Sequence, residues 1–187
     1  MALTPLSEAL ELILATAVAR PEREVVALEA AANRFCAEAI CADRAVPPAD
    51  NSAMDGYAVA SRDVPGVLSV SQRVPAGQAP APLQEGTAAR IFTGAEIPEG
   101  ADSVILQEEA QVLAEGVKLP AATSGQHIRR RGDDIRPGDR LVAAGQRVAP
   151  PDTGLLASVG SDARKVFRPL TVAVLTTGDE LREPGSG

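Results

Sequence analysis

Short apolar runs interrupted by glycine and proline fill the chain from Tyr57 to about Ile128, and this pattern limits the fold more than any other feature. Each run has the length and apolar content of a strand, and turn signals such as Pro98-Glu99-Gly100 separate the runs. The runs are Val67–Val70, Ala88–Phe92, Ser103–Leu106 and Val112–Leu119. Such a series is typical of a small all-β unit. With 16 Gly and 15 Pro, the chain favours turns and short strands over a helical bundle.

A mixed pattern precedes this stretch. Apolar residues recur at helical spacing from Leu6 to Ala17, with Ser7 as the expected N-cap. A short strand over 25–28 and a short helix over 29–32 follow. Asn33 stands where a helix takes a left-handed C-cap, a conformation that Asn adopts more readily than most residues.

Mixed character returns after the β-type stretch. We expect a strand over 140–142 and a helix over 151–159, which Gly160 ends. Leu170 to Leu175 is a near-continuous apolar run, the pattern of a strand buried on both faces of a parallel sheet. Residues 176–180 follow it, where α/β sheets place their ligand loops. Because no crossover helix follows, we expect that this strand opens an α/β domain of which the rest is missing.

Composition excludes several classes of function. The net charge of −7 and the near absence of aromatic residues argue against a nucleic-acid binder. No apolar run approaches the roughly 20 residues of a membrane span, and the amino terminus lacks the basic region of a signal peptide. Cys36 and Cys41 are too few for a disulfide framework. We therefore expect a cytoplasmic protein, with a core built from Ala, Val, Leu and Ile.

The loop most suited to chemistry spans residues 47–59, which read Pro-Pro-Ala-Asp-Asn-Ser-Ala-Met-Asp-Gly-Tyr-Ala-Val. Short polar side chains, Ser52 among them, crowd around Asp55-Gly56, a strong turn pair that can fix a carboxylate in space. The alternative is a tight turn that needs glycine and is acidic by chance.

Two further segments carry polar groups that suit anions. Thr93-Gly94 follows a strand, where a hydroxyl and a bare backbone amide could meet an oxyanion; an ordinary strand-to-turn transition is the alternative. Residues 129–131 are three consecutive arginines, whose guanidinium groups suit phosphate. Alternatively, Asp133 and Asp134 pair with them as a solvated charge patch.

Acidic residues also follow the last apolar run. Asp179 and Glu180 lie in the loop after it, and Mg²⁺ takes one or two carboxylates and completes its shell with water and phosphate oxygens. A helix N-terminus stabilised by two acids is the alternative.

Four segments together resemble a known family. They are residues 47–59, 90–104, 128–135 and 172–181. In this order and spacing they resemble the amino-terminal part of the molybdopterin molybdenumtransferases, the MoeA-type enzymes, whose animal relative is the E domain of gephyrin. The resemblance runs from about Leu6 to Pro184.

The resemblance implies an α+β fold. Residues 1–50 with 129–168 would form a discontinuous, elongated α/β linker domain, into which residues 51–128 insert as an all-β domain. Residues 169–187 would be the first strand and loop of a truncated α/β domain that binds molybdopterin.

The resemblance also implies roles for individual residues. Asp55, Thr93, Asp134 and Glu180 would be catalytic, and Asp55 and Glu180 would hold Mg²⁺. Ser52, Gly94, Arg129 and Asp179 would bind substrate, and Glu108 or Glu109 would lie near the cleft.

By this resemblance, the full enzyme inserts molybdate into adenylylated molybdopterin and releases AMP, with Mg²⁺ assisting. It would be a homodimer whose cleft joins two subunits, and a molybdopterin adenylyltransferase would act in the same pathway. The present chain would carry about half a site and be inactive alone. No nucleic acid or membrane is expected as a partner.

Two alternatives belong to other classes. A gephyrin-like scaffold or dimerisation module would share the fold without the reaction, but it has no need for Asp55, Arg129, Asp134 and Glu180 together. An isolated β-rich binding module would leave the run at 170–175 unexplained.

Overall fold

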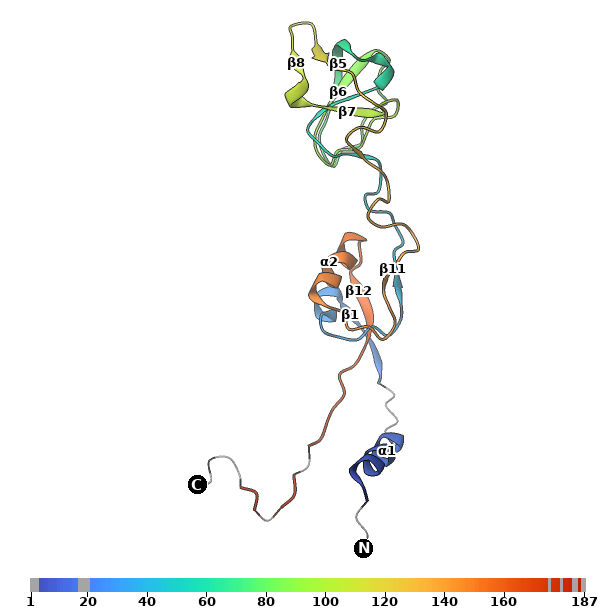
Figure 1. Cartoon of the computed structure of the whole chain (residues 1–187), viewed down its shortest axis with the longest axis vertical. Coiled ribbons are helices and arrows are strands. Elements are labelled where there is room, and N and C mark those ends of the chain that lie inside the picture. Colours follow the sequence, from blue (N-terminus) through green and yellow to red (C-terminus); the bar gives the residue numbers. More distant parts are fainter. Residues whose placement is uncertain (1–3, 17–20, 175, 179, 183–184, 186–187) are drawn as a thin grey trace.

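The structure is a computed structural model that describes residues 4–16, 21–174, 176–178, 180–182 and 185. The molecule is elongated (Figure 1). The chain runs from the amino-terminal end to a β-rich unit at the opposite end, and then returns alongside its first part. The ascending part contains helix α1 (Leu6–Thr16), strand β1 (Arg23–Ala27), the 3₁₀ turn η1 (Leu28–Ala31) and strand β2 (Ile40–Cys41). The returning part contains strand β11 (Arg140–Val142), helix α2 (Pro150–Ser158) and strand β12 (Ala163–Phe167).

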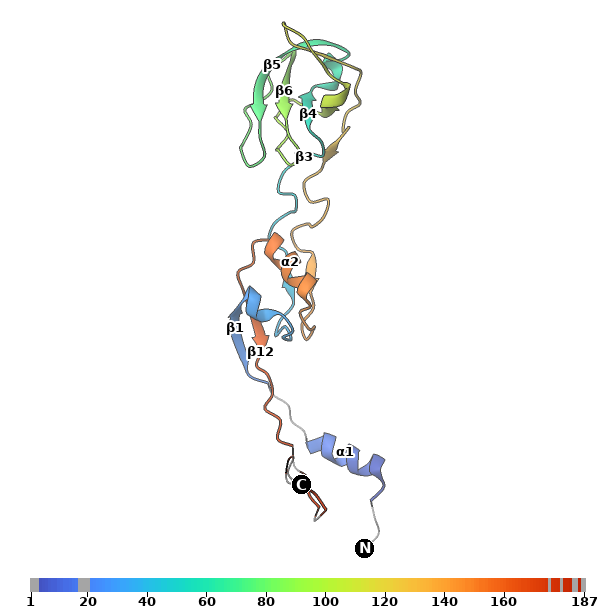
Figure 2. The ribbon, with the colours of Figure 1, turned by 90° about the vertical axis from the view of Figure 1, so that its left-hand side faces the viewer.

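The β-rich unit is a curled six-stranded sheet with strand order β7-β4-β6-β5-β9-β8 (Figure 2). Its strands are β4 (Gly56–Val59), β5 (Gly66–Val74), β6 (Thr87–Ile91), β7 (Ser103–Leu106), β8 (Gln111–Val112) and β9 (Val117–Leu119). Strands β5 and β6 run parallel, whereas the other neighbours are antiparallel. The 3₁₀ turns η2 (Ser61–Asp63) and η3 (Gln107–Glu109) follow β4 and β7, and β3 (Asn51–Ser52) pairs with β10 (Ile128–Arg129) below the sheet.

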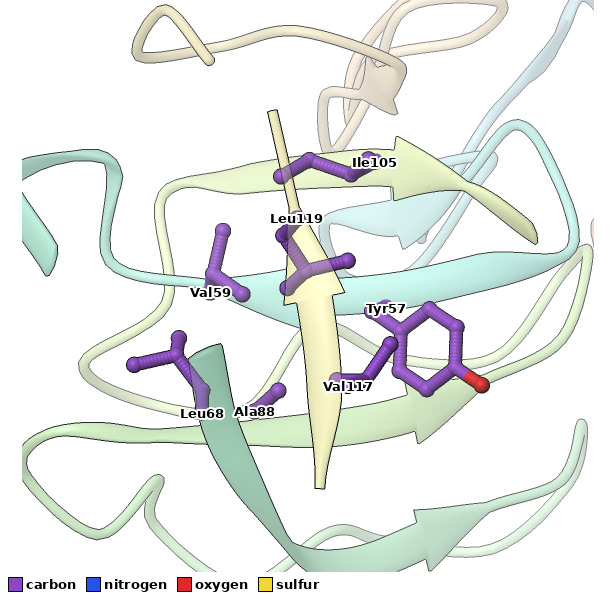
Figure 3. Packing of buried hydrophobic residues seen from close by; sticks show 7 residues of the cluster. All are labelled: Tyr57, Val59, Leu68, Ala88, Ile105, Val117 and Leu119. Atoms are coloured by element: carbon purple, nitrogen blue, oxygen red, sulfur yellow. The ribbon is translucent and has the colours of Figure 1, made fainter. Parts of the chain in front are cut away.

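Apolar side chains fill both faces of this sheet. Tyr57 and Val59 point into one cluster, where they lie against Ile105, Val117 and Leu119 (Figure 3). Ala58, between them in β4, belongs to the second cluster, because successive side chains of a strand face opposite ways. Apart from Tyr57, the buried hydrophobic residues are small or aliphatic, as the scarcity of aromatic residues predicts.

Segments from the two ends of the sequence share a second core. Strand β1 pairs antiparallel with β12, and β2 pairs with β11. The cluster beneath them contains Leu28, Cys36, Val142, Val148 and Leu156. The two chain segments that join this part to the six-stranded sheet bond to one another, because Val46 and Ile135 exchange backbone hydrogen bonds of 2.8 and 3.1 Å. This pattern is what a discontinuous domain with an inserted unit would produce, although the domain limits stay a prediction.

Several elements match the sequence-based expectation. Strands at 103–106 and 140–142 are confirmed, and α2 coincides with the expected helix to within a residue at each end. Asn33 has a φ of 66°, the left-handed conformation predicted for it. The expected strand at 112–119 is instead a hairpin of β8 and β9, because Gly116 turns the chain with a φ of 155°.

Two predictions are wrong. Ser7 does not cap α1, which already includes Leu6, and Pro5 O accepts the hydrogen bond of Ala9 N at 2.9 Å. Residues 170–174 form no strand, and Val172 and Val174 are 76% and 85% exposed. A strand exists only where a neighbour completes its hydrogen bonds, and none of the described residues pairs with this segment. Leu175 lies outside the described residues. None of the helices in the described part of the chain has the length and hydropathy of a membrane span.

Candidate functional site

Asp55 is held in a fixed orientation by Thr93. The Asp55 Oδ1 atom accepts hydrogen bonds from Thr93 N at 2.7 Å and from Thr93 Oγ1 at 2.8 Å. These two bonds, with a smaller contribution from the Arg90 charge, hold the pKa of the Asp55 carboxyl below its usual range. Asp55 Oδ2 receives no hydrogen bond from the described residues. The loop therefore presents an ionised carboxylate with one free oxygen.

Ser52 and Gly94 stabilise this loop through hydrogen bonds to its backbone. Ser52 is 1% exposed, and its Oγ atom donates to Met54 O at 2.6 Å. Gly94 N donates to Ser52 O at 2.9 Å, so this amide is not available to an oxyanion as the sequence suggested. Ser52 is buried in the ladder that joins the loop to residues 93–95, so within this chain it supports the loop, and its contact with substrate stays a prediction.

Arg90, Gln107 and Glu108 lie beside Asp55, and sequence reasoning did not single out the first two. Arg90 Nη2 donates to Gln107 Oε1 at 2.5 Å, and Gln107 Nε2 donates to Glu108 Oε1 at 3.0 Å. The bond from Gln107 is the main reason why the pKa of Glu108 is lowered, while the charge of Asp55 acts in the opposite direction. Glu108 and Asp55 are therefore close enough to repel each other. Arg90 lies within the 90–104 segment of the family resemblance, which is the signal that could have found it.

The arginine cluster is largely neutralised within the chain. Arg129 Nη2 lies 2.6 Å from Asp134 Oδ2, and Arg130 Nη1 lies 2.6 Å from Asp50 Oδ2. The alternative of pairing with Asp133 or Asp134 is therefore observed for Arg129, whereas the Arg130 side chain pairs with Asp50, which the sequence did not suggest. Both pairs are about half exposed, and such pairs contribute little to stability, so an anionic ligand could replace the acid at low cost.

Glu180 does not join Asp55 within one chain. The segment that carries Glu180 extends from β12 toward the amino-terminal end of the molecule, whereas Asp55 lies between β3 and β4 in the β-rich unit at the opposite end (Figures 1 and 2). Glu180 is exposed, and Asp179 lies outside the described residues.

A cleft of about 290 Å³ lies beside the Thr93–Gly94 turn. Its lining residues are Pro48, Ala49, Asn51, Gly77, Gln78, Ala79, Gly94 and Glu96. A larger, mostly apolar hollow of about 370 Å³ lies around Phe35 and Phe167 in the other part of the molecule. The smaller cleft is the one that adjoins the candidate site.

The sequence of residues 4–160 matches the family model described as the MoeA N-terminal region, domains I and II. The chain belongs to this family. It is 44% identical over 174 residues to a molybdopterin molybdenumtransferase from Haemophilus influenzae, a match that covers 88% of this chain and 42% of the relative. It is 39% identical to a protein of that name from Synechococcus elongatus, over 94% of this chain and 46% of the relative.

A solved MoeA structure has the same architecture. The molybdopterin biosynthesis MoeA protein from Pyrococcus horikosii superimposes with a TM-score of 0.86 at 36% identity, over 100% of this chain and 50% of that chain. The present chain therefore spans half or less of the length of these MoeA relatives.

The candidate site has few metal-binding side chains among the described residues. The described residues hold no group of three or more His, Cys, Asp or Glu side chains placed to bind a metal ion. Mg²⁺ requires less, since one or two carboxylates and water satisfy it. Asp55, ionised and with Oδ2 free, fits that requirement.

Proposed function

We propose that this chain is the amino-terminal part of a molybdopterin molybdenumtransferase, acting in molybdenum cofactor biosynthesis. The complete enzyme would insert molybdate into adenylylated molybdopterin and release AMP, in the cytoplasm, downstream of a molybdopterin adenylyltransferase. The names of the MoeA relatives support the reaction class. The observation that carries the proposal is the Asp55 carboxylate, which Thr93 keeps ionised and oriented in the β-rich unit.

Each residue of the site has a role in this proposal. Mg²⁺, when bound, would neutralise phosphate charge and lower the pKa of a bound water. Asp55 Oδ2 would hold the ion, while Thr93 fixes the carboxylate through Oδ1 and prevents it from rotating. Arg129 would exchange Asp134 for an anionic group of the substrate, and Asp134 would then be free to act as a base. Asp179 and Gly94 would border the substrate.

The proposal requires two subunits. Asp55 and Glu180 can approach one metal ion only if they come from different subunits, because the segments that carry them lie at opposite ends of the molecule (Figure 1). Exposed apolar residues on α1, such as Leu10 at 52% and Ile13 at 63%, support a homodimer. In such a dimer, residues 1–50 with 129–168 would be the linker domain and residues 51–128 the inserted domain. Residues 169–187 would open the α/β domain, so this chain alone would be inactive.

Calorimetric titration of Mg²⁺ into the purified chain tests the role of Asp55. We expect Asp55→Asn to weaken Mg²⁺ binding at least about tenfold, since the substitution removes the anionic ligand. Glu85→Gln, which removes an exposed acid from the same unit, serves as the control and leaves binding unchanged. Equal Mg²⁺ affinity in the wild-type chain and Asp55→Asn would contradict the proposal, and AMP release by the unmodified chain alone would contradict its predicted inactivity.

A further inference from the structure

Arg90 lies in β6, between strands β4 and β5 of the six-stranded sheet. The register places it opposite Tyr57 of β4 on one side and Arg73 of β5 on the other. Its guanidinium lies 5.4 Å from the centroid of the Tyr57 ring and 4.5 Å from that of Phe92. Guanidinium groups stack favourably on aromatic faces, so these two rings restrict the plane of the Arg90 fork.

The fork then bonds to the residue after Asp55 and, through Gln107, reaches the carbonyl of Asp55 itself. Arg90 Nη1 donates to the carbonyl of Gly56, the residue after Asp55, at 2.8 Å. Arg90 Nη2 donates to Gln107 Oε1, and Gln107 N donates to Asp55 O at 3.1 Å. These bonds close a ring through Arg90, Gln107 and the backbone of Asp55 and Gly56. The peptide that carries the Asp55 side chain is thereby fixed independently of Thr93.

The same fork determines where Glu108 lies. Because Arg90 occupies Gln107 Oε1, the amide of Gln107 must direct its Nε2 atom elsewhere, and that atom donates to Glu108 Oε1 at 3.0 Å. One guanidinium therefore orients the loop of Asp55 and, through one side-chain amide, the carboxylate in η3. Lysine could supply the charge but not this planar set of donors.

We propose that Arg90 is a positioning residue that holds Asp55 and Glu108 toward one common ligand through the Gly56 carbonyl and the Gln107 amide. This rests on the proposed function of Asp55 and extends it. Arg90 touches neither the metal nor the substrate in this role. Glu108 becomes a second acidic group of the site, on the neighbouring turn.

Amide hydrogen exchange in the chain tests the role of Arg90 directly. The Thr93 and Gln107 amides both donate to Asp55. We expect Arg90→Gln to raise the exchange rates of both amides about fivefold, as the loss of one ordinary hydrogen bond would. The rates of Val104 and Val117, in the same sheet, stay unchanged. Mg²⁺ affinity falls about tenfold, as for other outer partners of metal ligands.

Arg73→Gln is the matched control. Arg73 stands beside Arg90 in the register and lies 4.4 Å from the same Phe92 ring, but no hydrogen bond joins it to the Asp55 loop among the described residues. We expect no change at Thr93 or Gln107 in this variant, and we expect Arg90→Lys not to restore the wild-type rates. Equal effects of Arg73→Gln and Arg90→Gln, or full rescue by lysine, would overturn the proposal.

Gln107→Leu covers the case in which Arg90→Gln fails to fold. This variant retains the charge and the stacking of Arg90 and removes only the hydrogen bonds of the Gln107 side-chain amide. The backbone amides of residues 107 and 93 should again exchange faster. Unchanged exchange there contradicts the proposal. If the wild-type chain binds no Mg²⁺, only the proposed function of Asp55 is refuted. The exchange rates of the Thr93 and Gln107 backbone amides still decide the role of Arg90.

Discussion

Gly56, next to Asp55, lies where no side chain fits. A Cβ atom at this position would stand 1.9 Å from Ile105 O and 2.9 Å from Ile105 C, both backbone atoms of β7. We expect Gly56→Ala to lower the free energy of unfolding by about 3 kcal/mol, because the strand must move to relieve the overlap. Urea denaturation followed by circular dichroism measures this change.

Gly66→Ala provides the comparison within the same sheet. The nearest atom to a Cβ at Gly66 is Asp63 O at 3.9 Å, an ordinary contact, and the backbone there is not left-handed. Its effect should stay within about 0.5 kcal/mol. If both substitutions destabilise equally, the close approach of β7 is not the reason why glycine occupies position 56.

The sequence predicted the importance of Asp55-Gly56 but not its physical reason. An Asp-Gly pair indicates a turn in which glycine takes a positive φ, yet Gly56 lies in β4 and has no such backbone. It is needed because another strand passes over it. Asn33, by contrast, was predicted for the right reason, since its requirement is local.

Among the elements, two chain segments connect the sheet to the rest of the molecule, and Asp50 of the first accepts hydrogen bonds from Arg130 and Arg131 of the second. Asp50 Oδ1 accepts a hydrogen bond from Arg131 N at 2.8 Å, and Oδ2 accepts one from Arg130 Nη1 at 2.6 Å. The bond from Arg131 N contributes most to lowering the pKa of Asp50; burial opposes this effect, and the bond and charge of Arg130 add to it.

The contribution of Asp50 to stability should therefore depend on pH. A pKa that is lower in the folded state stabilises the fold fully above the unfolded value of 3.8, and this stabilisation is lost as the pH falls through the folded value. At neutral pH we expect Asp50→Asn to cost about 1 kcal/mol. Below pH 3.8 the difference between the two proteins should shrink toward zero.

Unfolding free energies of wild type and Asp50→Asn, measured from neutral to acidic pH, check this expectation. A difference between wild type and Asp50→Asn that stays constant down to the acid limit would show that the Asp50 carboxylate is not what joins the two segments.

How far elements could be predicted depends on whether their partners are near in the sequence. The α2 helix was predicted because Gly160 and the apolar residues before it are local signals. The strand expected at 170–175 was not found over 170–174, because an apolar β-branched run specifies a strand only together with a neighbouring strand. The Arg90 network was missed since it depends on the register of three strands.

At the scale of the whole molecule, the two cores have no residue in common. One pair of clusters lies in the six-stranded sheet and contains Ile105, and the other lies under β1, β12 and α2 and contains Leu156. Two chain segments join these parts (Figure 2), and Val46, Pro47 and Asp50 of one segment bond to residues 130–135 of the other. Cooperative unfolding spreads through shared packing, so each core should open as a unit of its own.

Leu156→Ala and Ile105→Ala make this separation measurable, because both side chains are fully buried. Each substitution should cost about 3 kcal/mol in its own core. Since additivity holds between distant sites, each should change the other core by less than about 0.5 kcal/mol. Native-state hydrogen exchange resolves the two, with Val142 and Val166 as probes for one core and Val104 and Ile91 for the other. If Leu156→Ala speeds exchange at all four probes equally, the connection transmits the full unfolding free energy, and the β-rich unit cannot be an independent insertion.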